Sequence, residues 1–398
     1  KGIPFNAFDD EEFDLFCEYV GHHGPGYKGP SQYQFRVPLL NKAYKKIDEE
    51  MDKTKELWDE YGCSILTDGW TDRKHRSVMN LCVHCKTGTH FLKSIEDSCN
   101  AHTGEYIFNW VEKCIQEVGE NRVLQVVTDN HSSNMAAKNI LKISRPNIFW
   151  SSCAAHTIDL MLEAIGKLPK YKLVIEKARS LTVFLYAHHS TLALMREFTN
   201  RRDLVRPGIT RFATTFLSLS CLVDKKSQLA AMVSSTKWDD NRWSKTEKGR
   251  ATKATIYSDV FWTNARELLK MYTPLFKLLR IVNADRRPSM GFVYGMLEDA
   301  KNEVQAACNR KETTYRPIID IIEKESRGRL DSTLHLAAYY LNPYYYYRDR
   351  TVQDSSRVIT ALMSCINVFY HDEDIQDKIG SSEVLSYKMK EGLMGSGM

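Results

Sequence analysis

Two short apolar runs that both end on Thr-Asp constrain the fold of this chain most. They span residues 62–68 and 123–129, are rich in Val, Ile and Leu, and break into Gly or Asn directly afterwards. An apolar run of this length, bounded by turn residues, predicts a strand buried on both faces. We therefore expect an α/β protein in which two buried strands each carry a carboxylate, Asp68 and Asp129, at the carboxyl end.

These two carboxylates form a candidate metal site. Open α/β sheets build their sites beyond the carboxyl ends of the strands. Mg²⁺ or Mn²⁺ prefers one or two such carboxylates together with water and phosphate oxygens, and two metals held in this way support in-line phosphoryl displacement. Asp is also common after strands because it caps turns and helices, so simple capping remains the alternative role for Asp68 and Asp129.

Composition excludes several classes of protein. The 398 residues predict about two or three domains. A hydrophobic content of 43% with 26% charged residues is ordinary for a globular protein, and no run is long enough to span a membrane. The ten cysteines are scattered, which indicates reduced intracellular thiols. Cys82 and Cys85 have CxxC spacing without a second pair nearby, so we expect no structural zinc.

The charge is distributed unevenly along the chain. The net charge of +5 does not by itself indicate nucleic-acid binding. Residues 196–211 and 242–253 are nevertheless basic, whereas the chain opens with acidic residues. These basic stretches predict a track for phosphate groups, and an ordinary solvated surface is the alternative.

The order of the expected elements defines the fold class. Strands are expected at 62–68, 78–86, 89–95, 122–128 and ending near 152, with helices at 103–119, 132–142 and 154–189. A mixed sheet with covering helices follows from this order. The order matches the ribonuclease-H-like fold, in which acidic residues of the first and fourth strands meet, and Asp68 and Asp129 occupy those places.

The rest of the chain is expected to be helical. Helical periodicity recurs through 213–235, 256–284, 290–310, 314–326 and 332–341, while the polar stretch 238–253 is interpreted as an exposed loop. The tyrosine run 344–347 is interpreted as a packing cluster. We expect four parts: an N-terminal helical segment (1–61), a ribonuclease-H-like core (62–189), a large all-helical insertion domain (190–345) and a C-terminal helical tail (346–398).

Four local motifs follow one another in a fixed order. They are Thr67–Asp72 (TDGWTD), Val127–Asn134 (VTDNHSSN), Ser152–Leu160 (SCAAHTIDL) and Pro207–Ala213 (PGITRFA). Together they resemble the hAT transposase superfamily, in particular plant hAT-like proteins with an uncharacterised central domain. The resemblance covers residues from about 62 to 343 and implies DNA as a partner, Mg²⁺ or Mn²⁺ as cofactor and the nucleus as location.

The resemblance also implies roles for the residues around the two carboxylates. Asp68 and Asp129 match the first two carboxylates of the family's Asp-Asp-Glu metal site. Cys153 and His156 match a Cys-x-x-His motif that lies beside this site and contacts the DNA end, with His156 counted among the catalytic residues. A Cys and a His at this spacing can also be two core residues on one helical turn.

Three further residues match DNA-contacting positions of the family. Trp70 corresponds to an aromatic residue of the active-site neighbourhood. Arg211 corresponds to the Arg of an Arg-Trp pair whose Trp stacks on a flipped base, and Phe212 replaces that Trp here. Phe can stack on a base with a smaller face and no N–H donor. The pair Arg211-Phe212 could equally lie at a seam between helices.

The chain departs from the family pattern at the third carboxylate. The family places this Glu in a Cys-Glu-Arg-Asn-Trp-like segment that begins its dimerisation region, and the sequence holds no such segment. We therefore expect a hAT-transposase-derived nuclear protein that associates with DNA and is non-catalytic as the chain stands. One alternative is a fragment of an active DNA transposase, performing cleavage and strand transfer, whose third carboxylate lies beyond residue 398. The other is a protein-interaction module, with homo-oligomers or protein partners and no small-molecule substrate.

Overall fold

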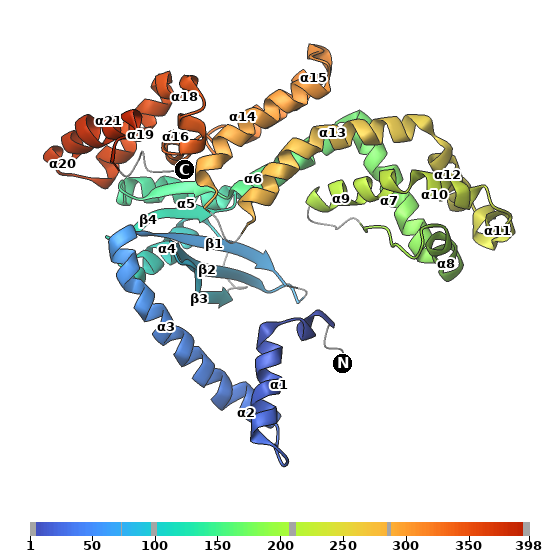
Figure 1. The fold of residues 1–398 in the computed structure, drawn as a ribbon, viewed down its shortest axis with the longest axis horizontal. Coiled ribbons are helices and arrows are strands. Elements are labelled where there is room, and N and C mark those ends of the chain that lie inside the picture. Colours follow the sequence, from blue (N-terminus) through green and yellow to red (C-terminus); the bar gives the residue numbers. More distant parts are fainter. Residues whose placement is uncertain (1–4, 73, 97–101, 207–211, 285–287, 393–398) are drawn as a thin grey trace. The chain divides into compact units, whose positions relative to one another are not determined.

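The computed structural model describes residues 5–72, 74–96, 102–206, 212–284 and 288–392, without the side chains of residues 5, 212 and 213. The chain divides into two compact units, Lys1–Glu60 and Tyr61–Met398. Figure 1 traces both units along the sequence. Because their relative placement is not determined, each unit is described by itself.

The first unit is entirely helical. It contains η1 (Phe5–Phe8), α1 (Glu11–His23), α2 (Gln32–Gln34), the π-helical turn η2 (Phe35–Leu39) and α3, which starts at Leu40 and continues to Tyr61. The cap of α1 is Asp10, whose carboxylate accepts a hydrogen bond from the Glu12 backbone N–H at 3.1 Å.

The second unit is built on a five-stranded sheet. Its strands are β1 (Cys63–Thr71), β2 (Ser77–Cys85), β3 (Gly88–Glu96), β4 (Val123–Thr128) and β5 (Phe149–Ser152), in the spatial order β3-β2-β1-β4-β5. β1, β2 and β3 pair antiparallel, whereas β1, β4 and β5 pair parallel. This mixed sheet with many helices confirms the predicted fold class and agrees with a ribonuclease-H-like core.

The two apolar runs form the neighbouring strands β1 and β4, as predicted, but β1 does not end at Asp68: it continues through Gly69 to Thr71, because these residues pair with β2. Ile65 of β1 lies opposite Val126 of β4, and both side chains are completely buried. The helices α4 (Gly104–Val118) and α5 (Ser132–Ser144) pack against each other beside the sheet (Figure 1). Their approach is close, because a Cβ placed on Gly104 would lie 2.4 Å from the Cβ of Ala136.

A long helical region follows β5. Its elements are α6 (Ala154–Gly166), α7 (Pro169–Ala187), α8 (His189–Phe198), α9 (Phe212–Asp224), α10 (Lys226–Val233), α11 (Thr236–Asp240), η3 (Arg242–Lys245), α12 (Glu247–Tyr257), α13 (Asp259–Val282), α14 (Met290–Ala307) and α15 (Glu312–Ser326). One apolar core runs through these helices from Ile158 to Leu330. Its centre is α13, which packs against α6, α7, α9 and α14. None of the described helices combines the length and the apolar character needed to cross a membrane.

The prediction of an exposed loop over 238–253 was wrong. The stretch forms α11, η3 and α12, and Trp238 within it is only 1% exposed. The polar residues that suggested a loop are helix caps: Asn241 accepts from the Trp243 backbone N–H and Thr246 from that of Gly249. Short capped helices have too few turns to show a helical period in the sequence, so their polar caps dominate the pattern.

The last part of the chain forms a second helical core. It consists of α16 (Thr333–Tyr340), α17 (Pro343–Tyr346), α18 (Arg350–Asp354), α19 (Ser356–Phe369), α20 (Glu373–Lys378), η4 (Ile379–Glu383) and α21 (Val384–Met389). The tyrosine run packs here, as predicted. Tyr346 is fully buried, with its ring centroid 4.7 Å from those of Tyr340 and Tyr387. Burial raises the pKa of Tyr346, which therefore stays neutral.

His335 in α16 predicts a loss of stability in mild acid. Its ring is 3% exposed and lies 2.8 Å from the Ser332 hydroxyl, and burial lowers its pKa from 6.5 to about 4. Between these two values the unfolded chain binds a proton that the folded chain does not, so stability falls as pH drops from 6.5 towards 4. The loss is on the order of 3 kcal/mol. Thermal melting of the wild type and His335→Gln across this pH range should show a smaller slope in the variant. Parallel slopes would contradict the prediction.

Candidate functional site

The candidate site lies at the carboxyl ends of β1, β4 and β5. The parallel register pairs Leu66 with Val127, and Thr128 with Ser152. Asp129 directly follows β4 and Cys153 directly follows β5. Asp68 lies within β1, which continues for three more residues to Thr71 and pairs there with β2. If the parallel register were continued by one or two residues, Asp68, Asp129 and Cys153 would stand in one row, at equal positions on neighbouring strands, which lie about 4.8 Å apart.

Asp129 is held in a fixed orientation by the start of α5. Its Oδ1 atom accepts hydrogen bonds from the His131 backbone N–H at 2.8 Å and from the Asn134 side-chain amide at 2.6 Å. The same turn lets the His131 ring accept from the Ser133 backbone N–H and cap α5. Asp129 can therefore stabilise the turn and also bind a ligand. Its Oδ1 atom accepts the two hydrogen bonds of the turn, and a carboxylate has a second oxygen that can bind a cation.

A hydrogen-bonded link joins this turn to the start of α6. The Cys153 backbone N–H donates to the Thr128 carbonyl at 2.6 Å, and the Thr157 hydroxyl donates to the Cys153 carbonyl at 2.9 Å. Because its proton is used there, the Thr157 oxygen accepts from the Asn130 side-chain amide, also at 2.9 Å. This fixes which way the Asn130 amide points and leaves its carbonyl oxygen buried, with no hydrogen-bond partner among the described residues.

A polar ladder runs beneath the row on the same face of the sheet. The Ser64 hydroxyl donates to the Gln125 carbonyl oxygen at 3.1 Å, and the Gln125 amide donates to the Ser151 hydroxyl at 2.7 Å. Gln125 and Ser151 are buried. A satisfied network across three strands restricts strand register, since a slip would leave buried polar groups unpaired. The ladder therefore helps to fix the register of β1, β4 and β5.

His156 and Trp70 lie close in the chain to Cys153 and Asp68, respectively. His156 lies in the first turn of α6, three residues after Cys153, and is exposed. Trp70 is 50% exposed and lies two residues after Asp68 on β1, which places both side chains on the same face. An exposed indole beside a carboxylate row offers a stacking surface for a base. Arg211 lies outside the described residues, as do the side-chain atoms of Phe212, whose backbone begins α9.

The donor set suits a hard divalent cation. Two carboxylates at neighbouring strand ends supply oxygen ligands, the kind that Mg²⁺ and Mn²⁺ prefer, with water and phosphate completing the shell. No cluster of three or more His, Cys, Asp and Glu side chains in the described part of the chain is arranged to hold a metal ion. A cation here would therefore depend on Asp68, Asp129 and ligands from water or substrate.

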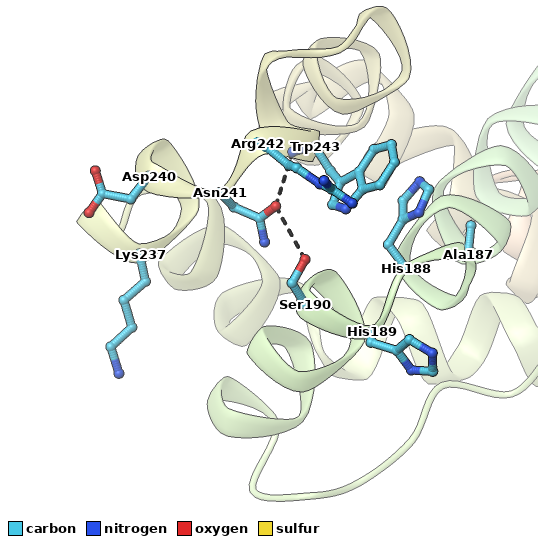
Figure 2. Close-up of a pocket in the computed structure, with 9 residues that line it drawn as sticks. All are labelled: Ala187, His188, His189, Ser190, Lys237, Asp240, Asn241, Arg242 and Trp243. Carbon is cyan, nitrogen blue, oxygen red and sulfur yellow. Dashed lines mark hydrogen bonds between the residues drawn. The ribbon is translucent and has the colours of Figure 1, made fainter.

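A second polar feature lies in the helical region. An open hollow of about 790 Å³ is lined by residues of the α7–α8 junction and of α11 and η3: Ala187, His188, His189, Ser190, Lys237, Asp240, Asn241, Arg242 and Trp243. Figure 2 shows these side chains around the hollow, with Asn241 hydrogen-bonded to Ser190 and to the Trp243 backbone. Asn241 thereby fixes η3 against the start of α8.

One wall of the hollow consists of two stacked aromatic rings and an arginine. The His188 ring lies parallel to the Trp243 ring with centroids 3.5 Å apart, and the Arg242 guanidinium lies 4.5 Å from the same indole (Figure 2). Lys237 at the rim is paired with Glu197. A guanidinium held over an indole is preorganised to meet a phosphate, since less side-chain entropy is lost on binding.

The sequence alone had missed several of these roles. His131 and Asn134 lie inside a motif that was noted, but only Asp129 within it had been given a role. The spacing of Asp129 and His131 is a signal for a turn in which the Asp side chain accepts a backbone N–H two residues later. The hollow had no signal beyond the basic stretch that begins at Arg242, because its walls come from segments about fifty residues apart.

Comparison with known proteins gives one positive result. No curated protein matches the chain. Residues 30–181, which include α3, all five strands and the row of Asp68, Asp129 and Cys153, match the family described as "Domain of unknown function (DUF659)", a domain associated with hAT-like transposase-related proteins.

Proposed function

We propose that this chain is derived from a hAT-like transposase and acts as a nuclear protein that associates with DNA. The observation that supports the proposal is the parallel pairing of β1, β4 and β5 in a β3-β2-β1-β4-β5 sheet, with Asp68 within β1, Asp129 directly after β4 and Cys153 directly after β5. The matched family over residues 30–181 supports the same origin. A bound Mg²⁺ or Mn²⁺ would supply positive charge that attracts a DNA phosphate to this row.

The residues of the chain have separate roles in this proposal. Asp68 and Asp129 hold the cation, and the bonds from His131 and Asn134 keep Asp129 in place. Trp70 offers its exposed ring to a base, and His156 at the start of α6 contacts the backbone of the DNA end. We propose association as the activity of this chain, because two carboxylates hold a cation more weakly than the family's three.

Duplex binding tests the proposal directly. The full chain, titrated into a fluorescein-labelled duplex, should raise its anisotropy, more strongly with Mn²⁺ than with EDTA. The affinity should fall with rising salt, because bound counterions are released from the DNA. Absence of duplex binding at low salt, with the chain folded by circular dichroism, would contradict DNA association. A fluorescent-protein fusion excluded from the nucleus would contradict the proposed location.

The second candidate function is metal-dependent DNA cleavage. It is supported by the occurrence of Asp68 within β1 and of Asp129 directly after the neighbouring strand β4, since two carboxylates can hold the metal ions of an in-line phosphoryl displacement. Nicking of supercoiled plasmid by the full chain in Mg²⁺ or Mn²⁺, lost in Asp68→Asn, would establish cleavage. An equal nicking rate in the wild type and the variant would assign the activity to a contaminating nuclease.

The hollow in the helical region supplies a separate prediction for DNA affinity. Replacing Arg242 by Ala should weaken duplex binding at all sequences and reduce the slope of log affinity against log salt by about 1, the change expected for one phosphate contact. Arg280→Ala, which removes an exposed arginine outside the hollow, serves as the matched control. Identical salt slopes for Arg242→Ala and the wild type would exclude the hollow as a phosphate contact.

A further inference from the structure

The first unit carries an apolar stripe along α3 that is largely exposed. Leu40, Tyr44, Ile47 and Met51 follow one another along α3 at alternating spacings of four and three residues. This is the heptad pattern by which one helix packs along another. The exposed fractions of Leu40, Tyr44 and Ile47 are 60%, 64% and 62%, so the stripe is open over its first half. A helix with such a stripe is stabilised chiefly by packing it against a partner.

The helical segment that carries the stripe begins at a capping box and continues without a break. Ser31 and Gln34 form a capping box before it: the Gln34 N–H donates to the Ser31 hydroxyl, and the Ser31 N–H donates to the Gln34 side chain. From Gln32 to Tyr61 the chain is helical without a break, through a π-helical turn around Pro38. At 1.5 Å per residue this segment is about 45 Å long, comparable to the stripes of short coiled coils.

The charges of this segment are separated along its length. Residues 32–46 carry four basic residues and no acidic one, a net charge of +4. Residues 47–60 carry seven acidic residues and two lysines, a net charge of −5. The basic residues are Arg36, Lys42, Lys45 and Lys46, and the acidic ones are Asp48, Glu49, Glu50, Asp52, Glu56, Asp59 and Glu60.

The separation of charges along the segment favours an antiparallel pair of copies over a parallel pair. Two copies side by side in parallel would place like-charged halves together, which opposes association. Two antiparallel copies place the basic half of each against the acidic half of the other, and the boundary between residues 46 and 47 lies at the centre of the stripe. Tyr44 of one copy then packs against Ile47 of the other, in the alternation of an antiparallel coiled coil.

We propose that residues 40–51 are a self-association surface on which a second copy of this chain packs antiparallel. Specific interfaces bury about 800 Å² per partner, which the stripe reaches together with the charged residues on either side of it. The charged flanks complete the interface and set its direction. This surface is independent of the proposed DNA site, since it lies wholly in the first unit.

Sedimentation of the full chain tests self-association. The wild type should sediment as a dimer at micromolar concentration, and Tyr44→Glu with Ile47→Glu should sediment as a monomer with unchanged helix content. Val260→Glu, at a position 71% exposed on α13, is the matched control and should remain dimeric. A wild type that is monomeric throughout the micromolar range, or a dimer that survives the double variant, overturns the proposal.

Disulfide trapping tests the direction. Tyr44→Cys and Ile47→Cys chains, each also carrying Cys17→Ser to remove an exposed native thiol, are oxidised separately and as a mixture. An antiparallel pair yields a covalent dimer efficiently only in the mixture, because Tyr44 faces Ile47 of the other copy. Covalent dimers formed equally well by each variant alone indicate a parallel pair and overturn the antiparallel arrangement. No trapped dimer under any condition overturns the assignment of this stripe.

Discussion

Replacing Asp68 by Asn is expected to weaken Mn²⁺ binding by the full chain roughly 10–100-fold or more, since residues that merely orient metal ligands already contribute this much. The substitution removes one of only two carboxylate ligands in the row while keeping the shape of the side chain. Asp68 is exposed and lies within β1 opposite Asn80 of β2, and Asn keeps the size of its side chain, so folding should be unaffected. Asp129→Asn should give a similar loss of affinity, since it removes the other carboxylate. The turn should be kept, because the Asn carbonyl oxygen can still accept the hydrogen bonds from His131 and Asn134.

The measurement is Mn²⁺ titration by calorimetry, with thermal melting as the check on folding. Asp259→Asn is the control, because this carboxylate is 94% exposed and lies outside the row. It should bind Mn²⁺ as the wild type does. If Asp68→Asn binds Mn²⁺ with unchanged affinity, the carboxylate row is not a metal site and capping is the remaining role of these residues.

Replacing Trp262 by Ala is expected to destabilise the second unit by about 3–5 kcal/mol, the cost of removing a large aromatic side chain from a packed core. Trp262 is fully buried at the start of α13, with its ring centroid 4.9 Å from that of Phe261. Its indole N–H donates to the Ile256 carbonyl at 2.6 Å. Truncation therefore leaves both a cavity and a buried carbonyl without its donor, and the two costs add.

Urea unfolding followed by circular dichroism gives the free energy of unfolding for this comparison. Val260→Ala, on the same helix but 71% exposed, should change the stability by no more than about 0.5 kcal/mol. A Trp262→Ala variant as stable as Val260→Ala would mean that α13 is not the centre of the helical core.

Much of the sheet could be predicted because its strands differ sharply from their surroundings. The runs that became β1 and β4 contain Val, Ile and Leu, which favour strands, although β1 alternates buried with half-buried residues and continues three residues past its predicted end. The hairpin of β2 and β3 was recognisable from alternation and a tight turn at Lys86-Thr87. The short helices α11 and α12 were not, because caps and outward-facing polar residues make up most of their length.

The sequence singled out residues for the candidate site but could not give their arrangement. Asp68 and Asp129 were noted as the last residues of two apolar runs, and Cys153 through the resemblance of its Cys-x-x-His motif. Their alignment depends on the parallel register between β1, β4 and β5, which is set by contacts between segments about sixty and twenty-five residues apart. The stacking of His188 on Trp243 is likewise a contact between distant segments, for which a sequence carries no local pattern.

The sequence by itself determined the elements whose signals are local: strands from apolar runs, helices from their period, and the tyrosine run as packing. Such features depend on the conformational preferences and apolar spacing of residues that are close in the sequence, so they can be predicted from the sequence directly. Only the tertiary structure decided which strands lie side by side, which oxygen of Asp129 accepts the hydrogen bonds of the turn, and which segments line the hollow. These depend on long-range packing, where the register of one strand against another fixes the position of every side chain on it.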